Sequence, residues 1–311
     1  MAFDGKLFSG IGVFAAVADT GNFASAAAAL GITGSGVSRA IARLEQRVGA
    51  RLFERSPRAV MLTEEGKRFY VRVKPMLEEA EAAASELASG RSQVTGRLRI
   101  AADAPSASLV LAGALSALRV AYPKLDVEIV VRDTLNDLVS EGFDAALRFG
   151  EVEATGLRRI HLANTRILTV AAPALFSTFA KPARPQDLKT IPCVLLRDPG
   201  SGSPYSWRFI GAGGDIDIRL GNGLVVSDGT TLLAACIEGA GIAQLMEIEA
   251  RGALQSGLLV RQLEGWGDER YPLALYVSAR GVRPARVDAL IGQLKARSDI
   301  LITKGLLLAP Y

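Results

Sequence analysis

Side chains that can contact a nucleic acid are concentrated near the N-terminus of the chain. Between residues 31 and 62 there are six arginines against two glutamates, and Arg39 and Arg43 follow Thr33, Ser35 and Ser38 closely. Guanidinium and hydroxyl groups donate hydrogen bonds to phosphates and to the edges of bases. This pattern indicates a nucleic acid contact, and a solvated basic face is the alternative.

The apolar residues of the same stretch predict the helix that presents these groups. Val37, Ile41, Leu44 and Val48 recur in steps of four, three and four, which places them on one face of a helix. A second short helix over residues 23 to 30 precedes it, separated by a turn that contains Gly31. The sequence therefore predicts a helix-turn-helix, with an alanine-rich helical hairpin as the alternative.

Two short extended runs follow the helix-turn-helix, and another helix precedes it. Residues 51 to 63 read as a β-hairpin wing around a Ser-Pro-Arg tip, with Arg55 and Arg58 able to reach the DNA backbone or the minor groove. A helix over about Lys6 to Ala18 completes a three-helix body. Residues 1 to 62 are thus predicted to form a winged helix-turn-helix domain.

The N-terminal motifs resemble those of LysR-type transcriptional regulators. The resemblance rests on the segments Phe14-Ala15-Ala16-Val17, Gly21-Asn22-Phe23, Ala26-Ala27, Val37-Ser38-Arg39, Leu44-Glu45, Arg51-Leu52-Phe53-Glu54-Arg55, Leu62-Thr63 and Gly66. It implies that Thr33, Ser35, Ser38, Arg39 and Arg43 touch DNA and that Arg55 and Arg58 lie in the wing. The family often has Gln where this chain has Gly34, which removes one potential contact to a base.

The family resemblance also implies partners. It predicts double-stranded operator DNA, RNA polymerase at target promoters, a small-molecule effector, and homodimers that pair into a homotetramer. It further implies a bacterial protein located in the cytoplasm at the nucleoid. The segments YPKLDVEIV and EGFDAALRFG are most similar to the CrgA-like subgroup.

A long amphipathic helix is predicted after the wing. Thr63 is a suitable N-cap, and the apolar stripe Phe69, Val73, Met76, Ala80, Ala83, Leu87 continues to about residue 88. A second copy of the helix is the natural partner of such a stripe, so we expect a dimer through residues 63–90. Docking of the stripe on the chain's own C-terminal domain is the alternative. Pro75 is expected to kink the helix.

Strands and helices alternate in the remainder of the chain, which predicts an α/β fold with parallel βαβ units. The predicted helices include about 108–121, about 135–141, 173–180 and about 284–296. The family resemblance adds two lobes like those of a periplasmic solute-binding protein, with crossings near 166–170 and 266–273. The predicted domains are 1–62, a linker helix at 63–91, and an effector-binding domain at 92–301. Its lobe one covers about 97–167 and 268–301, and its lobe two about 168–267.

Two strand ends that lead into helix N-termini are the predicted effector site. Asp103 to Ser108 and Ser227 to Thr231 each supply backbone N-H groups and a helix dipole that attract carboxylates. We expect a small organic anion there, bound by Pro105, Ser106, Arg148, Phe149, Arg197, Ser227, Asp228 and Thr230. Ordinary capping boxes and surface ion pairs are the alternatives.

Catalytic chemistry is not indicated. The one histidine, His161, lies in a predicted strand without a neighbouring nucleophile, so no enzyme activity, metal or cofactor is expected. Cys193 and Cys236 are interpreted as buried thiols, with a redox-responsive regulator as the alternative. An enzyme or solute-binding protein on the same α/β scaffold is the remaining alternative. No leader segment or apolar run of membrane-spanning length is recognised, which favours a cytoplasmic protein without a membrane partner.

Overall fold

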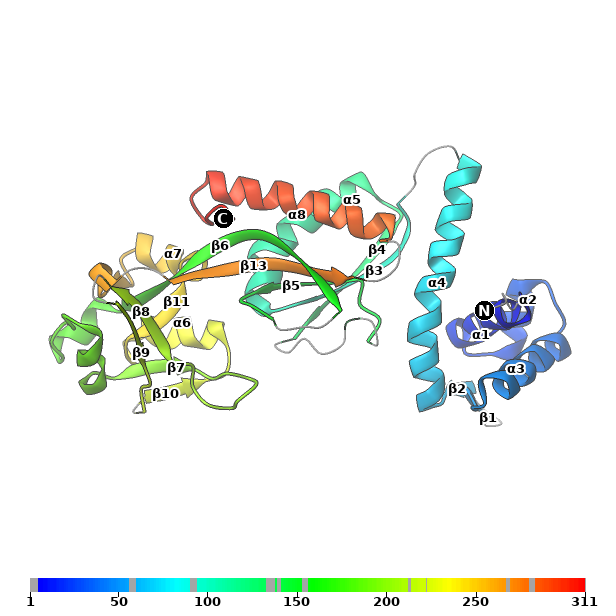
Figure 1. Cartoon of the computed structure of the whole chain (residues 1–311), viewed down its shortest axis with the longest axis horizontal. Helices are drawn as coiled ribbons and strands as arrows, with labels where there is room; N and C mark the ends of the chain where they lie inside the picture. Colours follow the sequence, from blue (N-terminus) through cyan, green and yellow to red (C-terminus); the bar gives the residue numbers. More distant parts are fainter. Residues whose placement is uncertain are drawn as a thin grey trace. The chain divides into compact units, whose positions relative to one another are not determined.

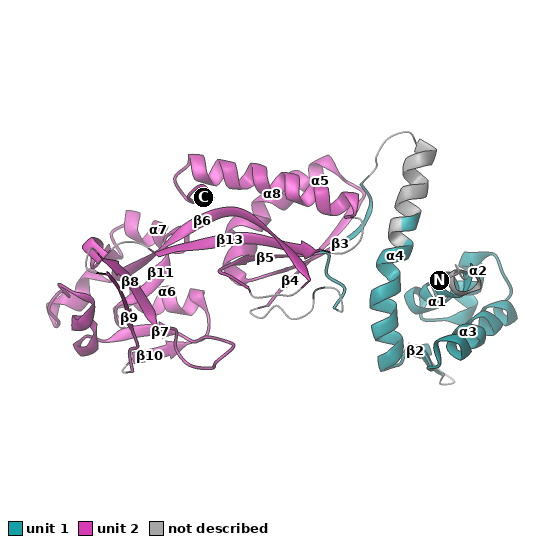
Figure 2. Ribbon diagram, in the orientation of Figure 1, with its two compact units in different colours: residues 1–97, 137–144 teal, residues 98–136, 145–311 magenta. Residues whose placement is uncertain are grey.

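The computed structural model describes residues 5–55, 60–89, 94–132, 138, 141–152, 156–211, 214–221, 223–266, 269–279 and 283–310. The side chains of residues 5–8, 55, 78–79 and 81–89 lie outside this description. The chain divides into two compact units, residues 1–97 with 137–144 and residues 98–136 with 145–311 (Figure 2).

Unit 1 contains the predicted winged helix-turn-helix and the long helix. Its elements in chain order are α1 (Gly5–Thr20), α2 (Phe23–Leu30), α3 (Gly34–Val48), β1 (Phe53–Arg55), β2 (Val60–Leu62) and α4 (Glu64–Ser89) (Figure 1). Local capping sets the first boundaries, because the Asn22 side chain accepts a hydrogen bond from the Ala24 N-H at the start of α2. Gly31 and Gly49 end α2 and α3 with φ of 64° and 72°, a region that favours glycine.

The wing and α4 meet at a close backbone approach. Thr63 caps α4 as predicted, since its hydroxyl oxygen accepts a hydrogen bond from the Gly66 N-H at 2.9 Å. A Cβ atom at position 66 would lie 2.0 Å from the carbonyl oxygen of Leu52, so a glycine is required there. The β1 and β2 strands pair antiparallel, with Phe53 opposite Leu62. The predicted β-hairpin is therefore confirmed, while its tip lies outside the described residues.

The apolar stripe of α4 has a divided role. Val73 is 5% exposed and belongs to the core of unit 1, with Phe69 and Leu77 packed against the same cluster. Met76, by contrast, is 55% exposed, and Ala80 is exposed as well. The expectation that the whole stripe lacks a core within its own chain is therefore wrong for Phe69 and Val73, because α1 to α3 supply that core.

Unit 2 is the α/β part of the chain (Figure 2). Its strands are β3 (Gly96–Ala102, which begins in unit 1), β4 (Leu125–Val131), β5 (Ala145–Phe149), β6 (Leu157–Ala171), β7 (Cys193–Leu196), β8 (Trp207–Gly211), β9 (Gly214–Ile218), β10 (Gly223–Val226), β11 (Ala243–Met246), β12 (Val260–Arg261) and β13 (Glu269–Ser278). Its helices are η1 (Ser106–Leu111), α5 (Ala112–Ala121), η2 (Pro173–Ser177), η3 (Pro185–Thr190), α6 (Gly229–Ile237), α7 (Glu247–Gln255), η4 (Glu264–Trp266) and α8 (Ala285–Thr303).

Two long strands join the lobes of this unit. Within the described residues the largest sheet has the order β11-β6-β13-β5-β3-β4, and β12 also pairs with β6. The strands β6 and β13 pair antiparallel along their length and run through both lobes (Figure 1). Lobe one holds β3, β4, β5, α5 and α8, and lobe two holds β7 to β12 with α6 and α7. The predicted crossings near 166–170 and 266–273 coincide with these strands.

Several elements differ from the expectations. The helix predicted from about 108 begins instead with a π-helical turn, Ser106–Leu111, before α5. A 3-10 helix, Pro173–Ser177, replaces the helix predicted near 173 to 180, and α8 extends to Thr303 rather than to about 296. Strand β8 was not anticipated. The helix predicted at about 135–141 falls largely outside the described residues.

The segment after α8 returns to the strands between the lobes. Asn164 of β6 exchanges two backbone hydrogen bonds with Leu308, at 2.8 and 2.7 Å, and its side-chain amide donates to the carbonyl oxygen of Ala309 at 3.0 Å. Arg251 of α7 donates hydrogen bonds to the carbonyl oxygens of Gly305 and Lys304. This segment therefore contacts both β6 and lobe two. Among the described residues, no helix is long and apolar enough to cross a lipid bilayer.

Candidate functional site

The exposed face of α3 is the first candidate site. Val37 and Ile41 are fully buried and Leu44 nearly so, which fixes the helix on the core of unit 1. On the opposite side Ser35, Arg39 and Arg43 are exposed, and Ser38 is half-buried. The predicted basic face is thus present and carries donors for phosphates and base edges.

Contacts within the helix hold these side chains along its N-terminal half. The hydroxyl of Thr33 caps α3 by accepting a hydrogen bond from the Gly36 N-H at 3.1 Å and lies 3.2 Å from the hydroxyl of Ser35. The Nε atom of Arg39 donates to the carbonyl oxygen of Ser35 at 3.2 Å. Arg43 makes the equivalent bond to the carbonyl oxygen of Arg39 at 3.3 Å. Both guanidinium groups therefore lie along the helix surface.

Glu45 is a residue of this site whose role was not foreseen. Sequence reasoning counted it only as a charge that offsets the arginines. Its Oε1 atom accepts hydrogen bonds from the backbone N-H groups of Leu52 at 2.7 Å and Phe53 at 3.2 Å. Glu45 thus ties the start of the wing to α3, and no spacing in the sequence pointed to this contact.

The position at which this chain departs from the family pattern is sterically open. A Cβ atom at Gly34 would meet no heavy atom within 4 Å, whereas one at Gly36 would approach the Thr33 hydroxyl oxygen at 3.2 Å. The absence of a Gln at 34 is therefore not imposed by packing. The side chain of Arg55 and the whole of Arg58 lie outside the described residues.

The second candidate site is a cavity of about 440 Å³ in unit 2. It collects residues from seven strands (β5, β6, β7, β8, β9, β11 and β13), from α6 and α7, and from the loop between β3 and η1. Six of the predicted effector residues line it: Pro105, Arg148, Phe149, Arg197, Ser227 and Asp228.

Two predicted effector residues do not line this cavity. Ser106 is fully buried, and its hydroxyl donates to the carbonyl oxygen of Leu147 at 2.8 Å, which joins the loop after β3 to β5. Thr230 is exposed in the first turn of α6. A serine in a helix-start pattern serves equally well as a structural cap, so the sequence could not separate the two roles.

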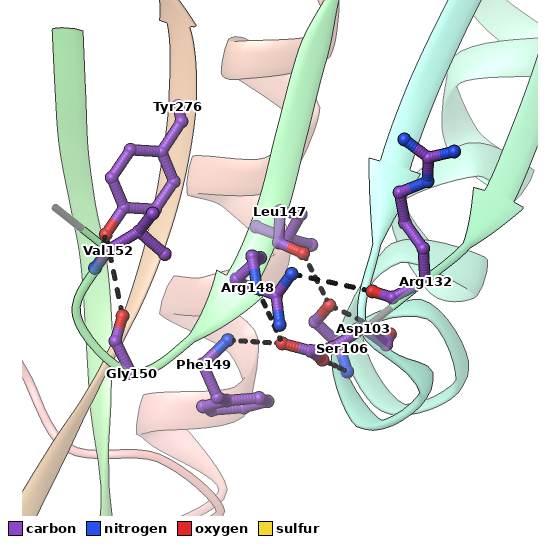
Figure 3. A network of polar contacts seen from close by, with 9 residues as sticks. All are labelled: Asp103, Ser106, Arg132, Leu147, Arg148, Phe149, Gly150, Val152 and Tyr276. Atoms are coloured by element: carbon purple, nitrogen blue, oxygen red, sulfur yellow. Dashed lines mark hydrogen bonds and ion pairs between the residues drawn. The ribbon is translucent and has the colours of Figure 1, made fainter. Parts of the chain in front are cut away.

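Asp103 organises the lobe-one side of the cavity (Figure 3). Its Oδ1 atom accepts a hydrogen bond from the Ser106 N-H at 2.8 Å, and its Oδ2 atom accepts one from the Phe149 N-H at 2.7 Å. The Nε atom of Arg148 lies 4.0 Å from Oδ2. Burial raises the pKa of Asp103, while these hydrogen bonds and the charge of Arg148 oppose the shift.

The walls of the cavity include aromatic side chains that sequence reasoning missed. Trp207 of β8, Tyr271 of β13 and Tyr205 join Phe149 among the lining residues. Trp207 is nearly fully buried in a core cluster of lobe two, so its position is fixed. Recognition of β8 as a strand would have been the signal, because Trp207 and Phe209 alternate with exposed residues.

The remaining reactive residues have structural environments. The Nε2 atom of His161 lies 3.0 Å from both the carbonyl oxygen of Ala163 and the side-chain oxygen of Asn164. Cys193 and Cys236 are buried free thiols, and burial raises their pKa to about 12 and about 11. Both thiols therefore stay protonated near neutral pH, which disfavours redox chemistry. Among the described residues no group of three or more His, Cys, Asp and Glu could hold a metal.

A DNA-reading helix-turn-helix on one unit and a ligand-sized cavity in the other define a class of one-component regulators. Family models support this assignment: residues 8–67 match the bacterial regulatory helix-turn-helix protein of the lysR family, and residues 91–299 match the LysR substrate binding domain. The chain belongs to the LysR family of transcriptional regulators, and the relatives it matches are regulators rather than enzymes.

Individual relatives cover nearly the whole chain. An uncharacterized HTH-type transcriptional regulator of Escherichia coli K12, YcaN, is 33% identical over 288 residues, covering 92% of this chain and 94% of its own. The regulator CrgA of Neisseria meningitidis serogroup C is 30% identical, covering 87% and 90%. A CrgA structure aligns over 98% of this chain and 99% of its own, with a TM-score of 0.55 and 26% identity.

A third relative was solved with a ligand. The structure of LysG from Corynebacterium glutamicum with bound effector Arg aligns over 97% of this chain and 99% of its own, with a TM-score of 0.62. At 21% identity this likeness concerns the fold.

Proposed function

We propose that the protein binds operator DNA as a dimer or a dimer of dimers and changes its DNA binding when a small organic effector enters the cavity. The observation that carries the DNA part is the exposed Ser35, Arg39 and Arg43 face above buried Val37 and Ile41. Through this binding it regulates RNA polymerase at its target promoters, as a cytoplasmic protein of the nucleoid.

The effector part rests on the cavity. Its volume suits a small organic molecule, and its lining combines aromatic walls with charged and hydrogen-bonding side chains that can orient a ligand. We propose that the effector carries a carboxylate directed at Arg148 and Arg197, both of which line the cavity. A relative of the same fold, LysG, holds the effector arginine, which supports the use of this domain for small molecules.

We propose that a ligand in the cavity changes DNA binding through β6 and β13, the strands that the two lobes share. A ligand that touches both lobes favours the closed arrangement by the free energy it gains from the second lobe. Half-sites on DNA repeat at helical-turn spacing. A change of a few ångströms between recognition helices of a dimer therefore alters which operator spacing fits.

Binding of Arg39→Ala to the protein's own upstream DNA tests the proposal. If Arg39 reads a base, the variant loses about 1 to 3 kcal/mol of specific binding free energy, measured by fluorescence anisotropy against scrambled DNA at fixed salt. Arg119→Ala is the matched control, because Arg119 is an exposed arginine of α5 in unit 2. Wild-type protein that binds scrambled and upstream DNA equally would contradict the proposed function.

A further inference from the structure

We propose that the effector of this cavity carries a cationic nitrogen, as an amino acid or a related amine does, and that this nitrogen lies between the carboxylates of Asp103 and Glu249. The inference rests on the proposed effector function of the cavity and specifies the class of molecule that fills it. Both carboxylates line the same cavity, one from each lobe.

The helix N-termini of the cavity already hold carboxylates of the protein itself. Asp103 accepts the hydrogen bond from the Ser106 N-H at the start of η1. Asp228 caps α6 by accepting a hydrogen bond from the Thr231 N-H at 2.8 Å, a contact that lowers its pKa. The positive ends of both helices are therefore neutralised, so a second anion at either end would meet a negative charge.

Glu249 of α7 places a further carboxylate beside α6. A Cβ atom at Gly229, the first residue of α6, would lie 2.8 Å from Oε1 of Glu249, so the glycine leaves room for this group. Within the described part of the chain, no ion pair to Glu249 is found. Burial and, secondly, the negative charge of Asp103 raise the pKa of Glu249 to about 7.

The charged residues of the whole lining also favour a cationic ligand. Five acids line the cavity, Asp103, Asp217, Asp228, Glu249 and Glu269, against three arginines, Arg148, Arg197 and Arg208. Two of these arginines already face acids, because Arg148 lies near Asp103 and Arg208 donates to Asp215, outside the lining, at 2.6 Å. The lining thus has more acidic than basic side chains.

A cation on the ligand would offset the unfavourable interaction of Glu249 with the negative charge of Asp103 in the same cavity. A partly desolvated carboxylate without a cationic partner is unfavourable, and a charge-assisted N-H···O bond compensates for the lost hydration. A carboxylate on the same ligand is still accommodated by Arg197, which is exposed at the cavity. These acids together with Arg197 therefore fit a zwitterion whose apolar part packs against Trp207 and Tyr271.

Matched sets of probes on the full chain test this assignment. The sets are phenylalanine with phenylpropanoate and phenethylamine, leucine with isocaproate and isoamylamine, and ornithine with valerate and putrescine. We expect the ammonium-bearing members of at least one set to raise the melting temperature and to bind in calorimetry. Compounds with only a carboxylate should bind about tenfold more weakly or worse.

Variants then locate the nitrogen. Glu249→Gln should lower affinity for the ammonium-bearing probe about tenfold or more and leave its carboxylate-only analogue unchanged. Gly229→Ala, which pushes on Oε1 of Glu249, should weaken the same probe. Glu238→Gln is the control, because Glu238 is an exposed acid at the other end of α6.

The outcomes separate this inference from the proposed function. If carboxylate-only probes bind best, or if Glu249→Gln leaves ammonium binding unchanged, the inference is overturned while the effector function stands. If no probe of any charge binds or alters operator binding, the inference and the effector part of the proposed function both fail. Arg39→Ala tests DNA binding independently of either result.

Discussion

At the scale of single residues, the carboxyl group of Glu249 sets a pH dependence of stability. Its pKa is raised from the ordinary value of 4.5 to about 7 in the folded protein. A raised folded-state pKa means that the contribution to stability is fully present below pH 4.5, the unfolded value, and is lost as pH rises to about 7. The charged form is the one that burial disfavours.

We therefore predict that Glu249→Gln is more stable than wild type above pH 7 and equal to it below pH 4.5. The pKa shift corresponds to a difference of about 3 kcal/mol in the free energy of unfolding. Urea unfolding followed by tryptophan fluorescence at a series of pH values measures it. Glu238→Gln should show no such trend, and an equal pH profile for wild type and Glu249→Gln would contradict the prediction.

The sequence could identify some residues of the cavity but not this acid. Arg148 and Asp228 follow strand patterns, so their place at strand ends was predictable. Glu249 lies in a helix with an ordinary acidic first turn, where a glutamate reads as a favourable helix start. Its place in the same cavity as Asp103 depends on how two lobes fold together, which no local pattern encodes.

At the scale of elements, α4 is divided between two uses. Phe69 and Val73 pack on the core of unit 1, whereas Met76 and Ala80 remain exposed on the same helix. Exposed apolar groups that continue a helical stripe are suited to a second copy of the helix. Val73 is therefore a poor probe of dimerisation, because a charge there would destabilise the core.

We predict that Ala80→Asp separates dimers, since it places a charge on the exposed stripe. Ala24→Asp is its matched control, because Ala24 is an exposed alanine of α2 in the same unit and lies outside the stripe. Analytical ultracentrifugation measures the association, and the double variant Met76→Asp/Ala80→Asp strengthens the test. Variants that all sediment as wild type would exclude α4 as the dimer contact.

Element boundaries followed the sequence where local chemistry decides them. Asn22, Thr33 and Thr63 mark helix starts by capping, and Gly31 and Gly49 mark helix ends. Strand β8 escaped prediction because the apolar but exposed Ile210 interrupts the alternation of apolar and polar residues that Trp207, Arg208 and Phe209 begin. The π-helical turn at Ser106–Leu111 escaped as well, since the apolar spacing of this segment does not distinguish a π-helical turn from an α-helical one.

At the scale of the whole effector-binding unit, the strands β6 and β13 pair with strands of both lobes. The strand β13 pairs with β5 in lobe one through Leu273 to Val277, while β6 pairs with β11 in lobe two through Ile167 to Val170. Because these strands also pair with each other, loss of one lobe exposes the sheet edge of the other.

We predict that damage to the core of lobe one is detected in lobe two. Leu118→Ala removes a fully buried side chain from lobe one, which should destabilise the unit by about 2 to 5 kcal/mol. Both tryptophans of the chain, Trp207 and Trp266, belong to lobe two and report its unfolding. Their fluorescence midpoint should fall in Leu118→Ala and not in Val120→Ala, whose side chain is exposed. An unshifted midpoint would show independent lobes.

The open space at Gly34 has a consequence for how such a regulator changes its targets over evolutionary time. A residue whose replacement meets no neighbour is released from the packing constraints that fix Val37 and Ile41 in the same helix. Because the position lies at the start of the proposed DNA-reading helix, a new side chain there alters base contacts while the core is kept. Divergence of operator preference between descendants can therefore begin at residue 34 without a prior loss of stability.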